Sequence, residues 1–257
     1  MEEKKLAGLE PKAVLEYFEA LCAIPHGSHN TKAISDFLVD FAKKQQIRYI
    51  QDESNNIILF ADGTCGLEDH EPVVLQGHMD MVCEKDEGCP IDMDTQGLDL
   101  CHDNLCVFAK GTTLGGDDGI AVAYAMALIA DRTIPHPPLE VIITVDEEIG
   151  MLGADVIDVS MLKGRKMINL DSEDEGIFTV ACAGGATATI SLNVNRKAVY
   201  GPCVRFCVDG LRGGHSGAEI HKNRANANKV MGEFMSRILK LMPLCLTSFS
   251  GGNKDNA

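Results

Sequence analysis

Short apolar runs alternate along the chain with segments of helical periodicity, and this alternation constrains the fold more than any other feature. Apolar residues recur at helical spacing in residues 12–22 and 31–44, whereas residues 120–130 are Ala-rich and apolar almost all round, which predicts a buried helix. Strands separated by helices predict an α/β sheet with helices on both faces. The expected strands are NIILFA (56–61), PVVLQ (72–76), LEVIITV (139–145) and KMINL (166–170).

The pattern changes near residues 183–185. Polar and apolar residues alternate in ATATISLNV (186–194) and in CVRFCVDGL (203–211), which predicts half-exposed antiparallel strands. A helix with one apolar face is expected at about residues 226–242. We therefore expect a catalytic domain over residues 1–184 and the beginning of an α+β domain over residues 185–257.

Charge and hydropathy exclude several classes of protein. The net charge of −15 over 257 residues argues against a nucleic-acid partner, because a phosphate backbone repels an acidic surface. The amino terminus has no long apolar run after its lysines, so it is not a secretory signal. No stretch approaches the ~18 apolar residues of a membrane span. We expect a cytoplasmic protein with no membrane partner.

Ten cysteines are present, but none forms a CxxC pair. Disulfide frameworks belong to small secreted chains, so free thiols are the preferred interpretation. The alternative is a small metal or redox cluster formed by Cys83, Cys89, Cys101, Cys106 and His102.

Acidic and imidazole groups follow the expected strands. In open α/β sheets ligands bind just outside the carboxyl ends of the strands, so these groups are expected to converge. A lone His is usually structural, and an Asp at a helix start is usually an N-cap. Only the convergence of several such groups therefore indicates a functional site. The residues are His78 and Asp80, Glu147 and Glu148, Asp171, and Asp117 in a glycine-rich turn.

Carboxylates placed close together repel one another unless a cation neutralises them. Nitrogen and oxygen ligands suit zinc, with cobalt or manganese as substitutes. Two ions ~3.5–4 Å apart need a bridging carboxylate, and Asp117 is the best candidate. Asp80, two residues after His78 on an extended chain, faces the same side and can orient it. Of Glu147 and Glu148, one can ligate while the other acts as general base.

Five motifs occur in order along the chain: GHMDMV, GTTLGGDDGIAVA, VDEEIGMLGA, NLDSEDEG and GLRGGHSGAEIH. This set resembles the M20 family of co-catalytic zinc peptidases, and within it the aminoacyl-histidine dipeptidases. The resemblance implies a zinc-exopeptidase-like mixed sheet followed by a lid domain that also forms a homodimer.

The resemblance also implies which residues bind two zinc ions. His78, Asp117 and Asp171 would hold one ion, while Asp117 and Glu148 would contribute to the second. Family members are longer, and their last segment carries one more histidine ligand of the second zinc. We therefore expect the second domain to be truncated here and the 257-residue chain to lack dipeptidase activity by itself.

The remaining roles that the resemblance implies are catalytic. Asp80 would orient His78, and Glu147 would be the general base. His215, often donated across the dimer in this family, would bind the substrate's carboxylate or stabilise the oxyanion. The implied reaction is hydrolysis of Xaa-His dipeptides, such as β-alanyl-histidine, by a metal-activated water. The alternatives are another M20 activity, such as a carboxypeptidase or an N-acyl amino-acid deacylase, and a non-catalytic metal-binding module.

Overall fold

The computed structural model describes residues 4–103, 105–172, 175–181, 188–213 and 219–252. The chain divides into two compact units, Met1–Thr179 and Val180–Ala257. The division falls a few residues before the expected boundary between 184 and 185. The identification of the second unit as part of a lid domain stays a prediction.

A five-stranded sheet forms the centre of the first unit, with the strand order β1-β2-β6-β3-β7. Strands β3, β6 and β7 are parallel, whereas β1 and β2 are added to one edge in antiparallel orientation. The mixed sheet predicted from the sequence is therefore confirmed. The strands are β1 Arg48–Gln51, β2 Ile57–Ala61, β3 Val73–His78, β6 Leu139–Thr144 and β7 Lys166–Asn169.

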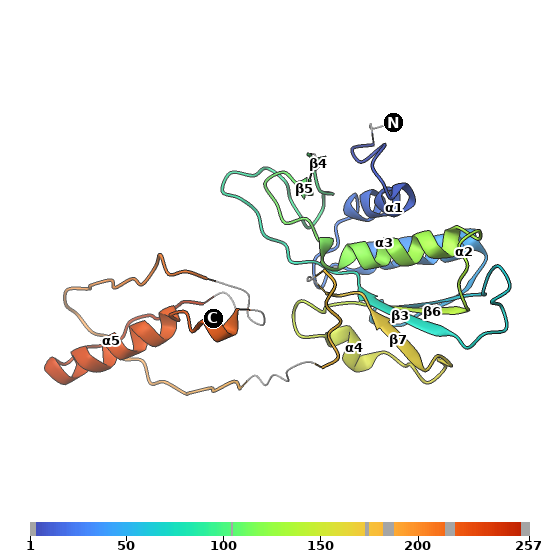
Figure 1. Ribbon diagram of the computed structural model, residues 1–257. Coiled ribbons are helices and arrows are strands. Elements are labelled where there is room, and N and C mark those ends of the chain that lie inside the picture. Colours follow the sequence, from blue (N-terminus) through green and yellow to red (C-terminus); the bar gives the residue numbers. More distant parts are fainter. Residues whose placement is uncertain (1–3, 104, 173–174, 182–187, 214–218, 253–257) are drawn as a thin grey trace. The chain divides into compact units, whose positions relative to one another are not determined.

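Helices lie on both sides of this sheet (Figure 1). On one side α2 (Lys32–Gln45) and α3 (Gly116–Ala130) pack against the strands, and α1 (Lys12–Cys22) packs against α3. The short helix α4 (Leu152–Val156) lies on the other side. These three helices were predicted to within a few residues, α1 and α2 from apolar residues that follow the helical period and α3 from its Ala-rich, apolar composition.

The core of the first unit lies between the sheet and its helices. Helix α3 is buried almost all round, as its composition predicted, and Ala123 and Met126 are fully inaccessible. Its regular part begins after Asp118, since Asp117 and Asp118 have non-helical backbone angles. The aspartates at the start of α3 therefore stand on a buried, well-packed helix.

The cysteine-containing stretch between β3 and α3 forms a small antiparallel ribbon that the sequence did not reveal. Its strands are β4 (Leu100–His102) and β5 (Val107–Ala109), each too short to show a period. The nine cysteines that the structure describes are free. No cysteine belongs to the one metal-binding group found among the described residues. Free thiols are the interpretation that the structure supports.

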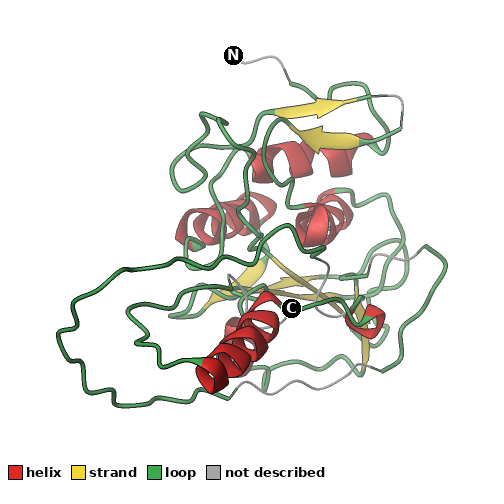
Figure 2. Ribbon diagram, turned by 90° about the vertical axis from the view of Figure 1, so that its left-hand side faces the viewer, coloured by secondary structure: helices red, strands yellow, loops and turns green. Residues whose placement is uncertain are grey.

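In the second unit, Val180–Ala257, the helix α5 (Ala227–Leu241) forms as expected. Its first turn is capped by Asn226, whose side chain accepts a hydrogen bond from the backbone nitrogen of Lys229 at 3.0 Å. A short 3₁₀ turn, Ile220–Lys222, precedes it. Outside its helices, the described residues of this unit are drawn as loop in Figure 2.

The expected strands in residues 186–194 and 203–211 are not formed in the part that the structure describes, 188–213. This prediction was wrong for those residues. A strand exists only when its backbone N–H and C=O groups pair with a neighbouring strand, and no such ladder forms within the described residues of this unit. Alternation in a sequence shows which face would be buried, not which strand would be the partner.

Across the described residues, no helix combines the length and apolar character that crossing a lipid bilayer requires.

Candidate metal centre

The carboxyl ends of β3, β6 and β7 meet at one edge of the sheet because the three strands are parallel. His78 is the last residue of β3, and Asp171 follows β7 directly after Leu170. Glu147 and Glu148 lie in the loop that follows β6, just beyond Val145. The first turn of α3 reaches the same edge, where Asp118 contacts the backbone of His78.

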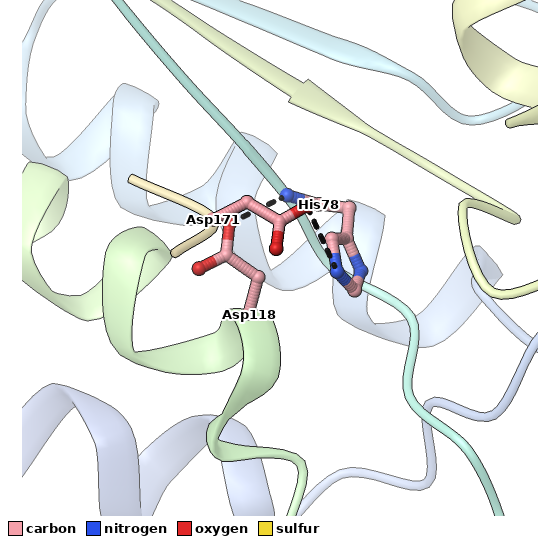
Figure 3. Close-up of side chains that lie close together, drawn as sticks. All are labelled: His78, Asp118 and Asp171. Atoms are coloured by element: carbon pink, nitrogen blue, oxygen red, sulfur yellow. Dashed lines mark hydrogen bonds and ion pairs between the residues drawn. The ribbon is translucent and has the colours of Figure 1, made fainter. Parts of the chain in front are cut away.

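Three of these side chains form a group that could hold a metal ion. One ligand atom each from His78, Asp118 and Asp171 lies within 4.8 Å of the others. Figure 3 shows the two carboxylates on the side of β3 that faces α3, with the imidazole beside them. An imidazole nitrogen with carboxylate oxygens is a ligand set that zinc and similar divalent ions accept. The residues present therefore fit a divalent cation.

The imidazole of His78 is the centre of a wider set of contacts. Its Nε2 lies 3.1 Å from Asp117 Oδ1 and 3.9 Å from both Glu147 Oε2 and Asp171 Oδ2. These carboxylates come from three segments that are far apart in the sequence. Three of the carboxylates singled out from the sequence thus surround a single nitrogen atom of His78.

Asp80 supports this arrangement from the protein interior. The Nδ1 atom of His78 lies 2.9 Å from the backbone oxygen of Asp80 and 3.4 Å from its Oδ1. The same carboxylate accepts hydrogen bonds from the backbone nitrogen atoms of Glu147 at 3.0 Å and Glu148 at 3.4 Å, and from the hydroxyl of Ser28 at 2.8 Å. Asp80 therefore contacts both the histidine and the loop that carries the two glutamates.

Burial and charge together shift the pKa values in this group. Burial alone lowers the pKa of His78, but hydrogen bonds to Asp117 and Asp80 outweigh it and raise that pKa to about 11. Burial, with repulsion from Asp171 and Asp117, raises the pKa of Asp118 to about 7. Burial is also the main reason that the pKa values of Glu147 and Glu148 are raised. The site holds more negative charge than its single imidazolium can balance, which favours binding of a cation.

Asp80 differs from its neighbours in this respect. Burial tends to raise its pKa, but the hydrogen bonds from His78, Glu147 and Ser28 prevail, so that the pKa is lowered. The carboxylate stays ionised at neutral pH and keeps accepting these hydrogen bonds.

Asp118 is the member of the group that the sequence did not single out. Its Oδ2 accepts a hydrogen bond from the backbone nitrogen of His78 at 3.2 Å, and its side chain is buried. The Asp-Asp pair in GGDDG was the available signal, but adjacent side chains diverge, and only packing decides which one turns toward the strand.

Among the other expected residues, Glu148 donates a hydrogen bond from its backbone nitrogen to the carboxylate of Asp80. The charge of Asp117 contributes to the raised pKa of Glu148. His215 lies outside the described residues. The structure therefore brings together His78, Asp80, Asp117, Glu147 and Asp171, and it leaves the place of His215 unassigned.

Known proteins give a consistent comparison, although no family model matches the chain. The chain is 38% identical to the cytosol non-specific dipeptidase of Escherichia coli over 255 residues, which are 98% of this chain and 53% of that protein. It is 37% identical over 98 residues to peptidase T of Vibrio cholerae, covering 36% of this chain and 24% of that protein. The crystal structure of aminoacylhistidine dipeptidase from Vibrio alginolyticus matches with a TM-score of 0.68 and 33% identity, over 92% of this chain and 49% of that one.

The sheet and the candidate site have the form of an α/β peptidase domain with side chains that could hold a metal ion. In sequence the chain is similar to the M20 peptidases, as its five motifs indicated. It spans about half the length of the first curated relative, covering 53% of it.

Proposed function

We propose that this chain carries the metal centre and the general base of a metallodipeptidase that hydrolyses Xaa-His dipeptides. The observation that carries the proposal is the convergence on one imidazole, His78, of carboxylates from three other segments. A binding module needs ligands, but it has no use for an additional carboxylate such as Glu147 placed beside them.

The residues that would hold the metal are His78, Asp117, Glu148 and Asp171. Asp117 would be shared between two zinc ions, with cobalt or manganese as substitutes. When bound, such ions polarise the peptide carbonyl and lower the pKa of water. Asp118 would hold the backbone of His78, since its Oδ2 lies 3.2 Å from that nitrogen.

Glu147 is the proposed general base. Its carboxylate lies beside the metal group, 3.9 Å from His78 Nε2, and its pKa is raised, chiefly by burial. A raised pKa brings a carboxylate nearer to the working pH, where a base both accepts and returns a proton efficiently. Glu147 would accept a proton from the attacking water and deliver it to the leaving amine. Asp80 would fix the ring of His78 and the backbone of the glutamate loop.

The substrate class rests on the relatives rather than on a pocket. The solved relative is an aminoacylhistidine dipeptidase, and the curated relative is a cytosol non-specific dipeptidase. Dipeptide hydrolysis is common to both descriptions, and the proposed Xaa-His substrates are based on the description of the solved relative. Broader dipeptide specificity is the second candidate, favoured by the name of the curated relative. A cytosolic location is proposed on the same basis.

Homodimer formation through residues 185–257, with His215 reaching a neighbouring site, is part of the proposal. If His215 acts across a dimer, a mixture of His215→Ala and Glu147→Gln variants regains activity, provided that both chains are completed with the second half of the E. coli dipeptidase, because each mixed dimer then contains one complete site. Mixtures that exchange subunits and stay inactive would place His215 in its own chain's site.

Metal binding tests the centre directly on the 257-residue chain. Titration with Zn²⁺ is expected to show binding that His78→Ala abolishes and Glu147→Gln retains. The control is Ser35→Ala, a buried residue that hydrogen-bonds to Asn55 and Gln51 and does not contact the site. Binding that survives His78→Ala would contradict the proposed centre.

Turnover is best tested in a hybrid chain, because this chain spans about half of its curated relative, 53%. Residues 1–257 replace the matching half of the E. coli dipeptidase, and hydrolysis of β-alanyl-histidine is compared with that of dipeptides without histidine. Glu147→Gln is expected to lower kcat by ~10²–10⁴-fold while metal content is unchanged. A near-normal rate in this variant would assign the base to another residue. Equal hydrolysis of all dipeptides would favour the broader specificity.

A further inference from the structure

The loop after β6, residues 145–153, carries both glutamates of the site. Its two ends, Val145 and Gly153, lie together and form the neck of the loop. Its ends are joined by a backbone hydrogen bond from Gly153 nitrogen to Val145 oxygen, 3.0 Å long. Within the loop, Asp146 and Met151 have positive φ angles of 55° and 58°, in the left-handed region that non-glycine residues rarely adopt. Such a conformation persists only when the surrounding structure imposes it.

Asn56, the residue before β2, supplies two further bonds at this neck. Its Oδ1 accepts a hydrogen bond from the backbone nitrogen of Val145 at 3.0 Å, and its Nδ2 donates one to the backbone oxygen of Gly153 at 3.0 Å. Asn56 is only 1% exposed, so solvent does not compete for these hydrogen bonds in the folded chain. One carboxamide thus binds both ends of the loop.

The carboxamide is itself held in a fixed orientation. Nδ2 also donates to Asp52 Oδ2 at 2.8 Å, which identifies the nitrogen side and leaves Oδ1 facing Val145. The backbone nitrogen of Asn56 donates to Asp52 Oδ1 at 2.9 Å. Gly153 approaches so closely that a Cβ atom there would overlap Asn56 Oδ1 and lie 2.5 Å from the oxygen of Val145. The hairpin between β1 and β2 is therefore locked to the glutamate loop.

We propose that Asn56 is a positioning residue, which closes the neck of the loop 145–153 and so determines where Glu147 and Glu148 stand at the site. The inference rests on the proposed function, because the two glutamates matter only at a metal-dependent site. Asp80 holds the same loop at other atoms, the backbone nitrogen atoms of the two glutamates. Asn56 does not touch the metal group, and it acts through the loop alone.

The test compares Asn56→Ala and Asn56→Asp with the matched control Ser35→Ala. Asn56→Asp keeps the size of the side chain and one acceptor, but it cannot donate to Gly153, and its charge faces Asp52. Ser35 is buried at the other side of the same hairpin turn, where its hydroxyl donates to Asn55 oxygen at 2.8 Å and makes no bond to the glutamate loop. The control therefore separates loss of the clamp from general destabilisation.

Two measurements are made on the 257-residue chain. Without metal, hydrogen–deuterium exchange of the amides of residues 146–152 is expected to become about tenfold faster in both Asn56 variants, and not in the control. In titrations with Co²⁺ alone, followed by visible absorption, the affinity is expected to fall ~10–100-fold in the Asn56 variants and to stay at the wild-type value in Ser35→Ala.

The proposal is overturned if exchange in residues 146–152 matches that of the control, or if the loop opens while the Co²⁺ affinity stays at the control value. If the wild-type chain binds no Co²⁺, the proposed metal centre fails, and the exchange measurement alone decides whether Asn56 holds the loop. Where Asn56→Ala does not fold, Asn56→Asp decides alone, because it keeps the size of the side chain and loses the donor to Gly153. It is expected to give the same faster exchange.

Discussion

Two adjacent aspartates at the start of α3 have opposite surroundings. Asp118 is 2% exposed and accepts a hydrogen bond from the backbone of His78. The side chain of Asp117 is 49% exposed, and its Oδ1 lies 3.1 Å from His78 Nε2. A ligand shared by two ions must face the site. A carboxylate that only holds the backbone can be buried, because a backbone N–H group supplies its hydrogen bond. This contrast supports the proposed bridging role of Asp117 and the proposed supporting role of Asp118.

Isosteric amides distinguish the two aspartates. Asp117→Asn is expected to lower Zn²⁺ affinity by more than ~100-fold, since a lost metal ligand costs more than a lost supporting contact. Asp118→Asn keeps an acceptor for the His78 backbone and is expected to cost less than about tenfold. Calorimetric titration measures both. The reverse order would make Asp118 the ligand and Asp117 the support.

Protonation at the site predicts how metal binding depends on pH. With its pKa raised to about 11, His78 is protonated at neutral pH in the metal-free chain, and it must lose that proton to bind a metal. Zn²⁺ binding at about pH 7.5 is therefore expected to release about one proton per chain, and affinity is expected to fall as the pH decreases. Titration in two buffers of different ionisation enthalpy measures the proton count. Binding without proton release would show that the free histidine is neutral.

At the scale of elements, the site depends on how closely α3 approaches β3. Gly77, the residue before His78, allows this approach, because a Cβ there would overlap Asp118 Oδ2 and lie 3.0 Å from Ala121 Cβ. The aspartate pair and the histidine thus meet because a strand residue without a side chain lies beneath the helix start.

Gly77→Ala is expected to destabilise the fold by ~1–3 kcal/mol and to weaken metal binding, because the added methyl group displaces the Asp118 carboxylate. The matched control is Gly119→Ala in α3, where the new Cβ meets only the ring edge of Phe18 at 3.3 Å. That change is expected to stay within about 1 kcal/mol, because Ala favours helices over Gly. Urea unfolding gives both values. Equal effects would mean that Gly77 is not needed for the close approach.

At the scale of the whole molecule, the division into two units separates the candidate centre from residues 180–257. The proposed metal ligands, from His78 to Asp171, lie in the first unit, which also contains the sheet. The hydrophobic core cluster likewise consists of residues of this unit. The first unit therefore has the elements that a metal site needs.

A chain of residues 1–179 is expected to bind Co²⁺ with the affinity and visible spectrum of the 257-residue chain. The physical reason is that the proposed ligands and their supporting residues Asp80 and Asn56 all belong to this unit. Absorption titrations of the two chains, side by side, measure the difference. A loss of affinity beyond about tenfold in a folded 1–179 chain would show that residues 180–257 contribute to the centre.

Local periodicity determined much of what could be predicted. The helices α1, α2, α3 and α5 and the strands β2, β3, β6 and β7 follow from runs whose period or apolar content is visible in the sequence. The short elements β1, β4, β5 and α4 lack such a signal. The strands expected in residues 188–213 had the signal but not a partner, and pairing is a property of two segments.

The sequence by itself determined that His78, Glu147 and Asp171 would meet, because parallel strands bring their carboxyl ends to one edge. Only the tertiary structure decided which aspartate turns inward and what holds the glutamate loop. Asp118 and Asn56 act through hydrogen bonds to backbone atoms of distant segments, His78 in one case and Val145 and Gly153 in the other. A sequence pattern reports the chemistry and period of side chains, whereas those contacts depend on which backbone groups the packed chain leaves to be satisfied.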